Sequence, residues 1–318
     1  MAKMPALPNS STPMAFLPEQ LAVQVTISTY ILVGTLGALV WNLLSNIHSD
    51  FHLLVRYPIK LPTIVYFFSR LAALGYAVLS TTFETAPISS PCFDFNKGVD
   101  WMFVLAMSST SFLFLIRVLA IFHRHKYIRA FFILMWLGVV AAVLTATQGV
   151  IGGSIGPTQH CMVSEARPYV GAAVVVPFVN DTFVFLAISW KLMSNTGVED
   201  LTLKSELRVF FRGDYLPALS RGLLKDGQVY YLTTVSTNLV TVVVFFIPFI
   251  PPVYRTMFTV PNAMLTNAMA CRVYKRTKFG FYRESADSGR LGDFPVSSKN
   301  DAISIPLTFA PPTIHQQA

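Results

Sequence analysis

Three ionisable side chains lie inside long apolar runs of this sequence, where a charge is expensive. Arg70 and Asp181 each lie near the middle of a run, with Asn180 beside the carboxylate. Arg117 lies about two turns from the middle of a third run. Such groups usually face the interior of a helix bundle, where they pair with one another or line a solute path. These four residues are therefore the polar candidates for binding, transport or coupling.

Arg70 and Asp181 fall within roughly 5 Å of the same depth in the membrane, at about 1.5 Å of rise per helical residue. We predict that they pair across the bundle, directly or through water. In the alternative, Arg70 extends toward the membrane surface, and Asp181 is protonated or bonded to a hydroxyl such as Thr182. Both arrangements remain open on the sequence alone.

Four histidines invite a metal interpretation. His48 and His52 are four residues apart, and His123 and His125 flank Arg124. A membrane desaturase or hydroxylase would need about twice as many histidines in clusters on one face. No nucleophile elbow, phosphate loop or His-Glu-x-x-His motif accompanies them. We therefore predict no metal, no cofactor and no enzymatic activity, and interpret the histidines as polar groups at the membrane surface.

The three cysteines differ in position. Cys92 follows the second apolar run and Cys161 follows the fourth, so a bundle of consecutive spans places both on one side. On an oxidising side they could form a disulfide, which we predict; two unpaired thiols remain the alternative. Cys271, at the end of the last run, is interpreted as a buried small residue rather than a palmitoylation site.

Seven apolar runs must position these residues, each near the roughly 20 residues of a transmembrane helix. The predicted spans are 21–44, 61–83, 101–122, 130–150, 168–190, 227–248 and 257–274. The composition agrees, with 53% hydrophobic and 13% charged residues, whereas soluble domains carry about 25% charge. We predict an all-α membrane protein, a seven-transmembrane helix bundle.

The lysines and arginines set the predicted orientation. Most of the 24 lie in alternate loops and in the segment after the last run. The positive-inside rule then places the N-terminus outside and the C-terminus in the cytosol, in a multi-pass protein of the plasma membrane. The net charge of +8 thus reflects topology, and we predict the lipid bilayer as a partner but not nucleic acid.

This orientation divides the chain into three parts. Residues 1–20 form an extracellular tail that carries a glycosylation sequon at Asn9. Residues 21–278 form the membrane domain, and 279–318, polar and without hydrophobic period, are predicted to be a disordered cytosolic tail. The long inner loop 191–225 is predicted to be amphipathic and to lie on the membrane surface. The inner loops and tail could bind a cytosolic signalling partner.

The predicted topology, with a disulfide between the start of the third span and the loop before the fifth, resembles that of G-protein-coupled receptors. The detailed motifs depart from that family. The inner end of the third span reads Ile116-Arg117-Val118, so only the arginine of the expected acidic-Arg-aromatic triplet is present. The seventh span lacks an Asn-Pro-x-x-Tyr motif and a lysine, which excludes a retinal Schiff base.

Three sequence segments resemble a group of seven-span integral membrane proteins of mushroom-forming fungi that often carry a domain of unknown function. They are Tyr66–Arg70, Arg221–Tyr231 and Asn267–Tyr274. The resemblance covers most of residues 20–278 and implies a fold and a compartment, but no ligand, reaction or catalytic residue.

These observations favour a receptor-like protein that senses an extracellular ligand and signals through its cytosolic loops. Two alternatives remain open. A small-solute transporter or channel is favoured by the charges within the membrane, and a membrane enzyme of lipid metabolism is favoured by the histidines alone. Topology by itself does not assign a function.

Overall fold

The computed structural model describes residues 13–56, 59–194, 218–247 and 251–291. The chain divides into two compact units, Met1–Arg276 and Thr277–Ala318, and the first contains every contact discussed below. Asn9, most of the predicted amphipathic loop and the end of the predicted tail lie outside the described residues.

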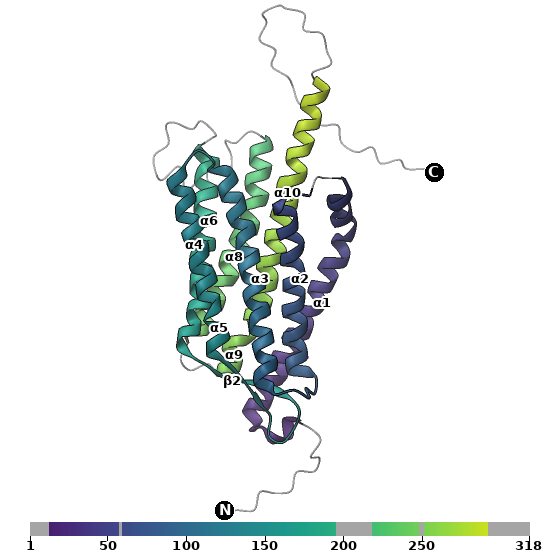
Figure 1. The fold of residues 1–318 in the computed structure, drawn as a ribbon, viewed down its shortest axis with the longest axis vertical. Helices are drawn as coiled ribbons and strands as arrows, with labels where there is room; N and C mark the ends of the chain where they lie inside the picture. The colour runs from purple at the N-terminus through teal and green to yellow at the C-terminus, as the bar shows by residue number, and fades with distance from the viewer. Residues whose placement is uncertain (1–12, 57–58, 195–217, 248–250, 292–318) are drawn as a thin grey trace, which may run out of the picture. The chain divides into compact units, whose positions relative to one another are not determined.

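Long helices packed side by side form the first unit (Figure 1). The helical elements are η1 Pro13–Phe16, α1 Glu19–Arg56, α2 Leu61–Thr85, α3 Cys92–Ile121, α4 Lys126–Leu144, α5 Ala146–Gly149, η2 Pro168–Gly171, α6 Ala172–Ser194, α8 Ala218–Phe246, α9 Pro252–Met257 and α10 Thr259–Leu291.

Within the part of the chain that the structure describes, five helices are long and apolar enough to cross a membrane. They span Glu19–Val55, Leu61–Thr85, Cys92–Ile121, Lys126–Gly149 and Pro168–Lys191, and Leu232–Phe246 is a shorter apolar helix. Large apolar side chains face outward from them, as at Trp41, which is 72% exposed, and Leu134, which is 67% exposed. Such a surface suits lipid rather than water. The fold agrees with the prediction of a helical membrane protein.

Several helix boundaries differ from the predicted spans. The first span was predicted to end at 44, but α1 continues to Arg56 and turns the expected loop around Asp50 into helix. The prediction of a disordered tail from 279 is wrong as far as Leu291, because α10 continues to that residue. The seventh predicted run lies at the start of α10, which is not among the five apolar helices.

A β-hairpin is the one departure from the all-α prediction in the described residues. Strands β1 (Val150–Ser154) and β2 (Cys161–Ala166) pair antiparallel, with Ser154 opposite Cys161. Gly152 and Gly153 lie within β1. The hairpin contacts α3, α2 and α9 at one end of the bundle, which we name the hairpin end. We name the other end, where α1 ends and α2 begins, the opposite end.

Candidate functional site

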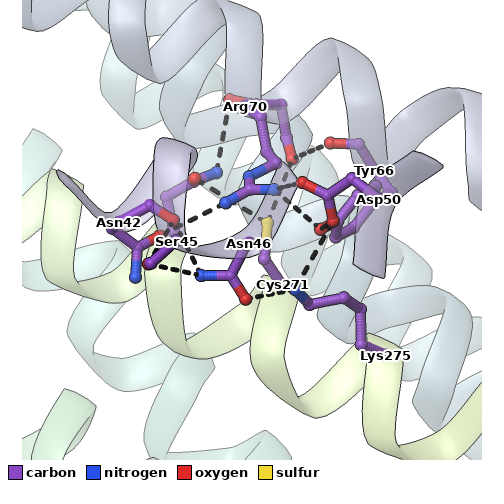
Figure 2. Close-up of polar contacts among 10 residues, drawn as sticks. Asn42, Ser45, Asn46, Asp50, Tyr66, Arg70, Cys271 and Lys275 are labelled. Carbon is purple, nitrogen blue, oxygen red and sulfur yellow. Dashed lines mark hydrogen bonds and ion pairs between the residues drawn. The ribbon is translucent and has the colours of Figure 1, made fainter. Parts of the chain in front are cut away.

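Arg70 lies in a buried polar cluster toward the opposite end of the bundle (Figure 2). Its guanidinium forms an ion pair with Asp50 of α1. It also donates hydrogen bonds to the Tyr66 hydroxyl at 3.0 Å and to Asn42 Oδ1 at 3.3 Å. Only 6% of the Arg70 surface is exposed, so protein groups replace the water that would otherwise solvate this charge.

Asp50 has a second cationic partner. Lys275 of α10 places its Nζ 3.4 Å from Asp50 Oδ1 and also donates to Asn46 Oδ1. Tyr66 donates its hydroxyl proton to Asp50 at 2.6 Å. We refer to these six residues, Asn42, Asn46, Asp50, Tyr66, Arg70 and Lys275, as the Asp50 cluster.

The Asp50 cluster follows from helical spacing. Asn42, Asn46 and Asp50 are four residues apart on α1 and so share one face, as do Tyr66 and Arg70 on α2. One carboxylate therefore joins three helices, and a single negative charge offsets two positive ones. A buried pair of this kind contributes little net stability while intact, but it is costly to break because a lone charge then remains buried.

Cys271 extends the polar contacts toward α3. Its buried sulfur lies 3.8 Å from Asn267 Oδ1 and 3.9 Å from Ser69 Oγ. Asn267 in turn donates to Thr110 Oγ1 of α3 at 2.9 Å. The burial of Cys271 agrees with its interpretation as a small core residue.

Asp181 lies in a separate polar group between α6, α8 and α10. Asn180 and Asn238 donate to its two carboxylate oxygens at 3.3 Å and 2.9 Å. Asn262 of α10 donates to Asn238 Oδ1 at 2.6 Å. The direct pair between Arg70 and Asp181 that we predicted is therefore not formed, because each residue has other partners.

The structure also contains the other residues that the sequence analysis singled out. Arg117 is half-buried in the last turns of α3. Cys92 and Cys161 form the predicted disulfide, with their Cα atoms 5.6 Å apart. Among the described residues, no group of three or more His, Cys, Asp or Glu side chains is arranged to hold a metal ion.

A cavity of about 100 Å³ lies inside the hairpin end, and sequence reasoning did not predict it. Side chains of α1, α2, α3, α6, α8 and α10 line it, together with both strands of the hairpin. Its polar residues include Tyr76, Ser80, Glu84, Asn96 and Asp100. Two carboxylates in one largely apolar cavity are the feature of this site that could recognise a ligand.

Local contacts fix the polar wall of this cavity. Ser28 of α1 donates to Glu84 at 3.1 Å. Asn96 donates to Asp100 at 3.1 Å and to the Val150 carbonyl oxygen at 3.2 Å, so it ties α3 to β1. The disulfide joins the start of α3 to β2 beside these bonds.

Gly152 lets β1 approach the cavity wall closely. A Cβ added there would lie 2.8 Å from Asn96 Cβ and 3.0 Å from the Cys92 carbonyl oxygen. We expect Gly152→Ala to lower the free energy of unfolding by about 1–3 kcal/mol, because the hairpin would have to move away. Thermal unfolding in lipid nanodiscs measures this.

Gly138 of α4 provides the matched control. An added Cβ there would meet no atom within 4 Å. Gly138→Ala should leave stability unchanged or raise it by about 0.5–1 kcal/mol, since alanine favours a helix interior. Equal effects of the two substitutions would contradict the close packing at Gly152.

Sequence reasoning missed Asp50, Glu84 and Asp100 as site residues. All three lie at or beyond the ends of predicted spans, where a charge is ordinary. The four-residue spacing of Asn42, Asn46 and Asp50 was the signal that could have placed Asp50 on a buried helix face.

Comparisons of the sequence with protein-family models and with curated proteins find no match. Function therefore has to be inferred from these contacts.

Proposed function

We propose that this chain is a receptor-like membrane protein with seven spans, in which α8 and α10 are the sixth and seventh. The support for α10 as a span is its hydrogen bonds to four other helices. Asn262 contacts α8, Asn267 contacts α2 and α3, and Lys275 contacts α1. A helix with polar bonds of this kind lies inside a bundle rather than on its surface.

In this proposal the hairpin end faces the outside of the cell and the C-terminus lies in the cytosol. The Cys92–Cys161 disulfide at the hairpin end suits an oxidising compartment. The basic segments at the opposite end suit the cytosolic face. The same orientation exposes Asn9 to glycosylation and presents the inner loops and tail to a cytosolic partner.

The observation that carries the receptor proposal is that α2 and α10, like α1, contribute side chains to both the cavity and the Asp50 cluster. α2 contributes Ser80 and Glu84 to the cavity inside the hairpin end, which we call the outer cavity. It also contributes Tyr66 and Arg70 to the Asp50 cluster. α10 contributes Thr259 to the cavity and Lys275 to the cluster. A ligand that changes the packing of α2 against α10 would therefore shift Asp50 between its two ion-pair partners, Arg70 and Lys275.

The proposal is tested by releasing α10 from α1. Lys275→Met removes the contact to Asp50 and keeps the Asp50–Arg70 ion pair, so the protein should still fold. We expect this variant, in nanodiscs, to stimulate nucleotide exchange on heterotrimeric G proteins severalfold above wild type. Arg276→Met, which removes the adjacent, exposed charge, is the control and should behave as wild type.

A small-solute transporter or channel is the second candidate, favoured by Asp181. This carboxylate is 2% exposed and has amide partners but no ion pair among the described residues. Flux of a solute or of protons into proteoliposomes that is lost in Asp181→Asn would favour the transporter. Such flux together with an inactive Lys275→Met would contradict the receptor proposal.

A further inference from the structure

The outer cavity contains two carboxylates that form no ion pair with any described residue. Asp100 is 6% exposed and Glu84 is half-buried. Neither forms an ion pair with any described residue, and their hydrogen bonds come from Asn96, Ser28 and Thr29. A carboxylate in such a place either binds a proton or binds a cation.

The nearest lysine on the same helix is turned to other partners. Lys97, one turn before Asp100, donates to the Thr147 carbonyl oxygen and lies 5.2 Å from the centre of the Phe93 ring. Its charge acts on Asp100 at a distance but forms no ion pair with it, so the carboxylate oxygens can still accept hydrogen bonds from a ligand.

A third polar group in the cavity, the Ser80 hydroxyl, completes no hydrogen bond among the described residues. Ser80 is 6% exposed and lines the cavity, and its hydroxyl lies near that of Tyr76. A buried hydroxyl without a partner is costly. A donor from a ligand in the cavity would satisfy it.

Aromatic rings complete the lining. Tyr76, Phe83, Phe103 and Phe245 all face the cavity, and the Tyr76 and Phe103 rings lie 5.3 Å apart. The face of an aromatic ring attracts a cation, and carboxylates beside such faces favour an ammonium group with a short apolar body.

We propose that this cavity binds a small organic ammonium ion, held by Glu84, Asp100 and the Ser80 hydroxyl against the aromatic lining. The N–H donors bond to the carboxylates and to Ser80, and the hydrocarbon part contacts the rings. The inference rests on the outer cavity that the proposed function uses, and it adds the chemical class of the ligand.

Binding is tested on the full chain in nanodiscs with n-butylammonium, n-butanol and tetramethylammonium as probes. We expect n-butylammonium to raise the apparent Tm in a saturable way. The alcohol lacks the charge and the quaternary ion lacks the N–H donors, so both should bind at least tenfold more weakly. If n-butanol or tetramethylammonium shifted the apparent Tm of the wild-type protein as much as n-butylammonium does, the proposal would be overturned.

Variants place the binding in the cavity. Glu84→Gln with Asp100→Asn should weaken n-butylammonium binding more than about a hundredfold, since each charged hydrogen bond contributes about 1.5–3 kcal/mol, which is about tenfold to a hundredfold in affinity. Ser80→Ala, which removes only the hydroxyl, should weaken it by a smaller factor. Asp94→Asn removes an exposed carboxylate of the same helix and should bind as wild type.

Unchanged affinity in both Ser80→Ala and the folded double variant would overturn the proposal. The readout is binding, so it is independent of signalling. If n-butylammonium binds but Lys275→Met does not stimulate nucleotide exchange, only the receptor proposal is contradicted. If Lys275→Met stimulates exchange but n-butylammonium does not bind, only the ligand class is contradicted.

Discussion

Asp50→Asn is expected to lower the free energy of unfolding by about 3–5 kcal/mol, the usual cost of removing one partner from a buried ion pair. Arg70 and Lys275 would then remain beside each other without a counter-ion. The side chains of Asp50 and Arg70 are 13% and 7% exposed, so water cannot take the place of the carboxylate. Thermal unfolding in nanodiscs measures the loss.

Two further variants separate charge from packing. Glu19→Gln removes an exposed carboxylate at the start of the same helix and should have little effect. Adding Lys275→Met to Asp50→Asn should recover part of the loss, because it removes one of two repelling cations. Strictly additive losses in the double variant would contradict the coupling between Asp50 and Lys275.

Replacing both Cys92 and Cys161 with alanine is expected to lower stability by about 2–4 kcal/mol. The disulfide links residues 69 apart in sequence and fixes β2 against the start of α3, beside the cavity. Its loss should therefore also weaken binding of n-butylammonium. Peptide mapping by mass spectrometry without reduction checks the bond itself, and thermal unfolding checks its effect.

Cys271→Ala provides the control for the disulfide. The buried thiol makes only long contacts, at 3.8 Å and 3.9 Å, so its removal should cost less than the loss of the disulfide. Alkylation of both Cys92 and Cys161 in unreduced protein would show that no disulfide forms.

The sequence predicted the helices better than their ends. Hydrophobicity identifies the part of a helix that faces lipid, so 21–44 was found as a span. The continuation of α1 to Arg56 is polar on one face because it packs on α2 and α10 through Asn46 and Asp50. Such a segment has no apolar run, and its tertiary partners determine its structure.

Depth alone could not predict the partner of Arg70. The midpoint of each apolar run gives the depth of a residue in the membrane but not the direction in which its side chain points. α6 packs against α3, α4 and α8, whereas α2 packs against α1 and α3, so Asp181 and Arg70 face different neighbours. The disulfide was predictable because both cysteines follow an even-numbered apolar run, and the structure has both at the hairpin end.

The cavity was beyond prediction for a related reason. Its wall depends on a β-hairpin whose strands begin where the fourth apolar run ends. Val150 was predicted to lie in a membrane helix, but it begins β1 of the hairpin, where its carbonyl oxygen accepts a hydrogen bond from Asn96 of α3. Short strands joined by non-local contacts leave little trace in hydrophobic periodicity.

An occupant of the outer cavity is expected to change the contacts of the Asp50 cluster through α2 and α10. The most direct measurement uses Ser80→Cys modified with aminoethyl methanethiosulfonate, which fixes an ammonium group in the cavity whatever its affinity. Mass spectrometry establishes that the modification is complete and that buried Cys271 is unmodified. Hydrogen–deuterium exchange is then compared in peptides 45–56 and 268–276, with 126–134 of α4 as reference. We expect altered exchange in the first two peptides alone, and unchanged exchange there at full modification would contradict coupling between the cavity and the Asp50 cluster.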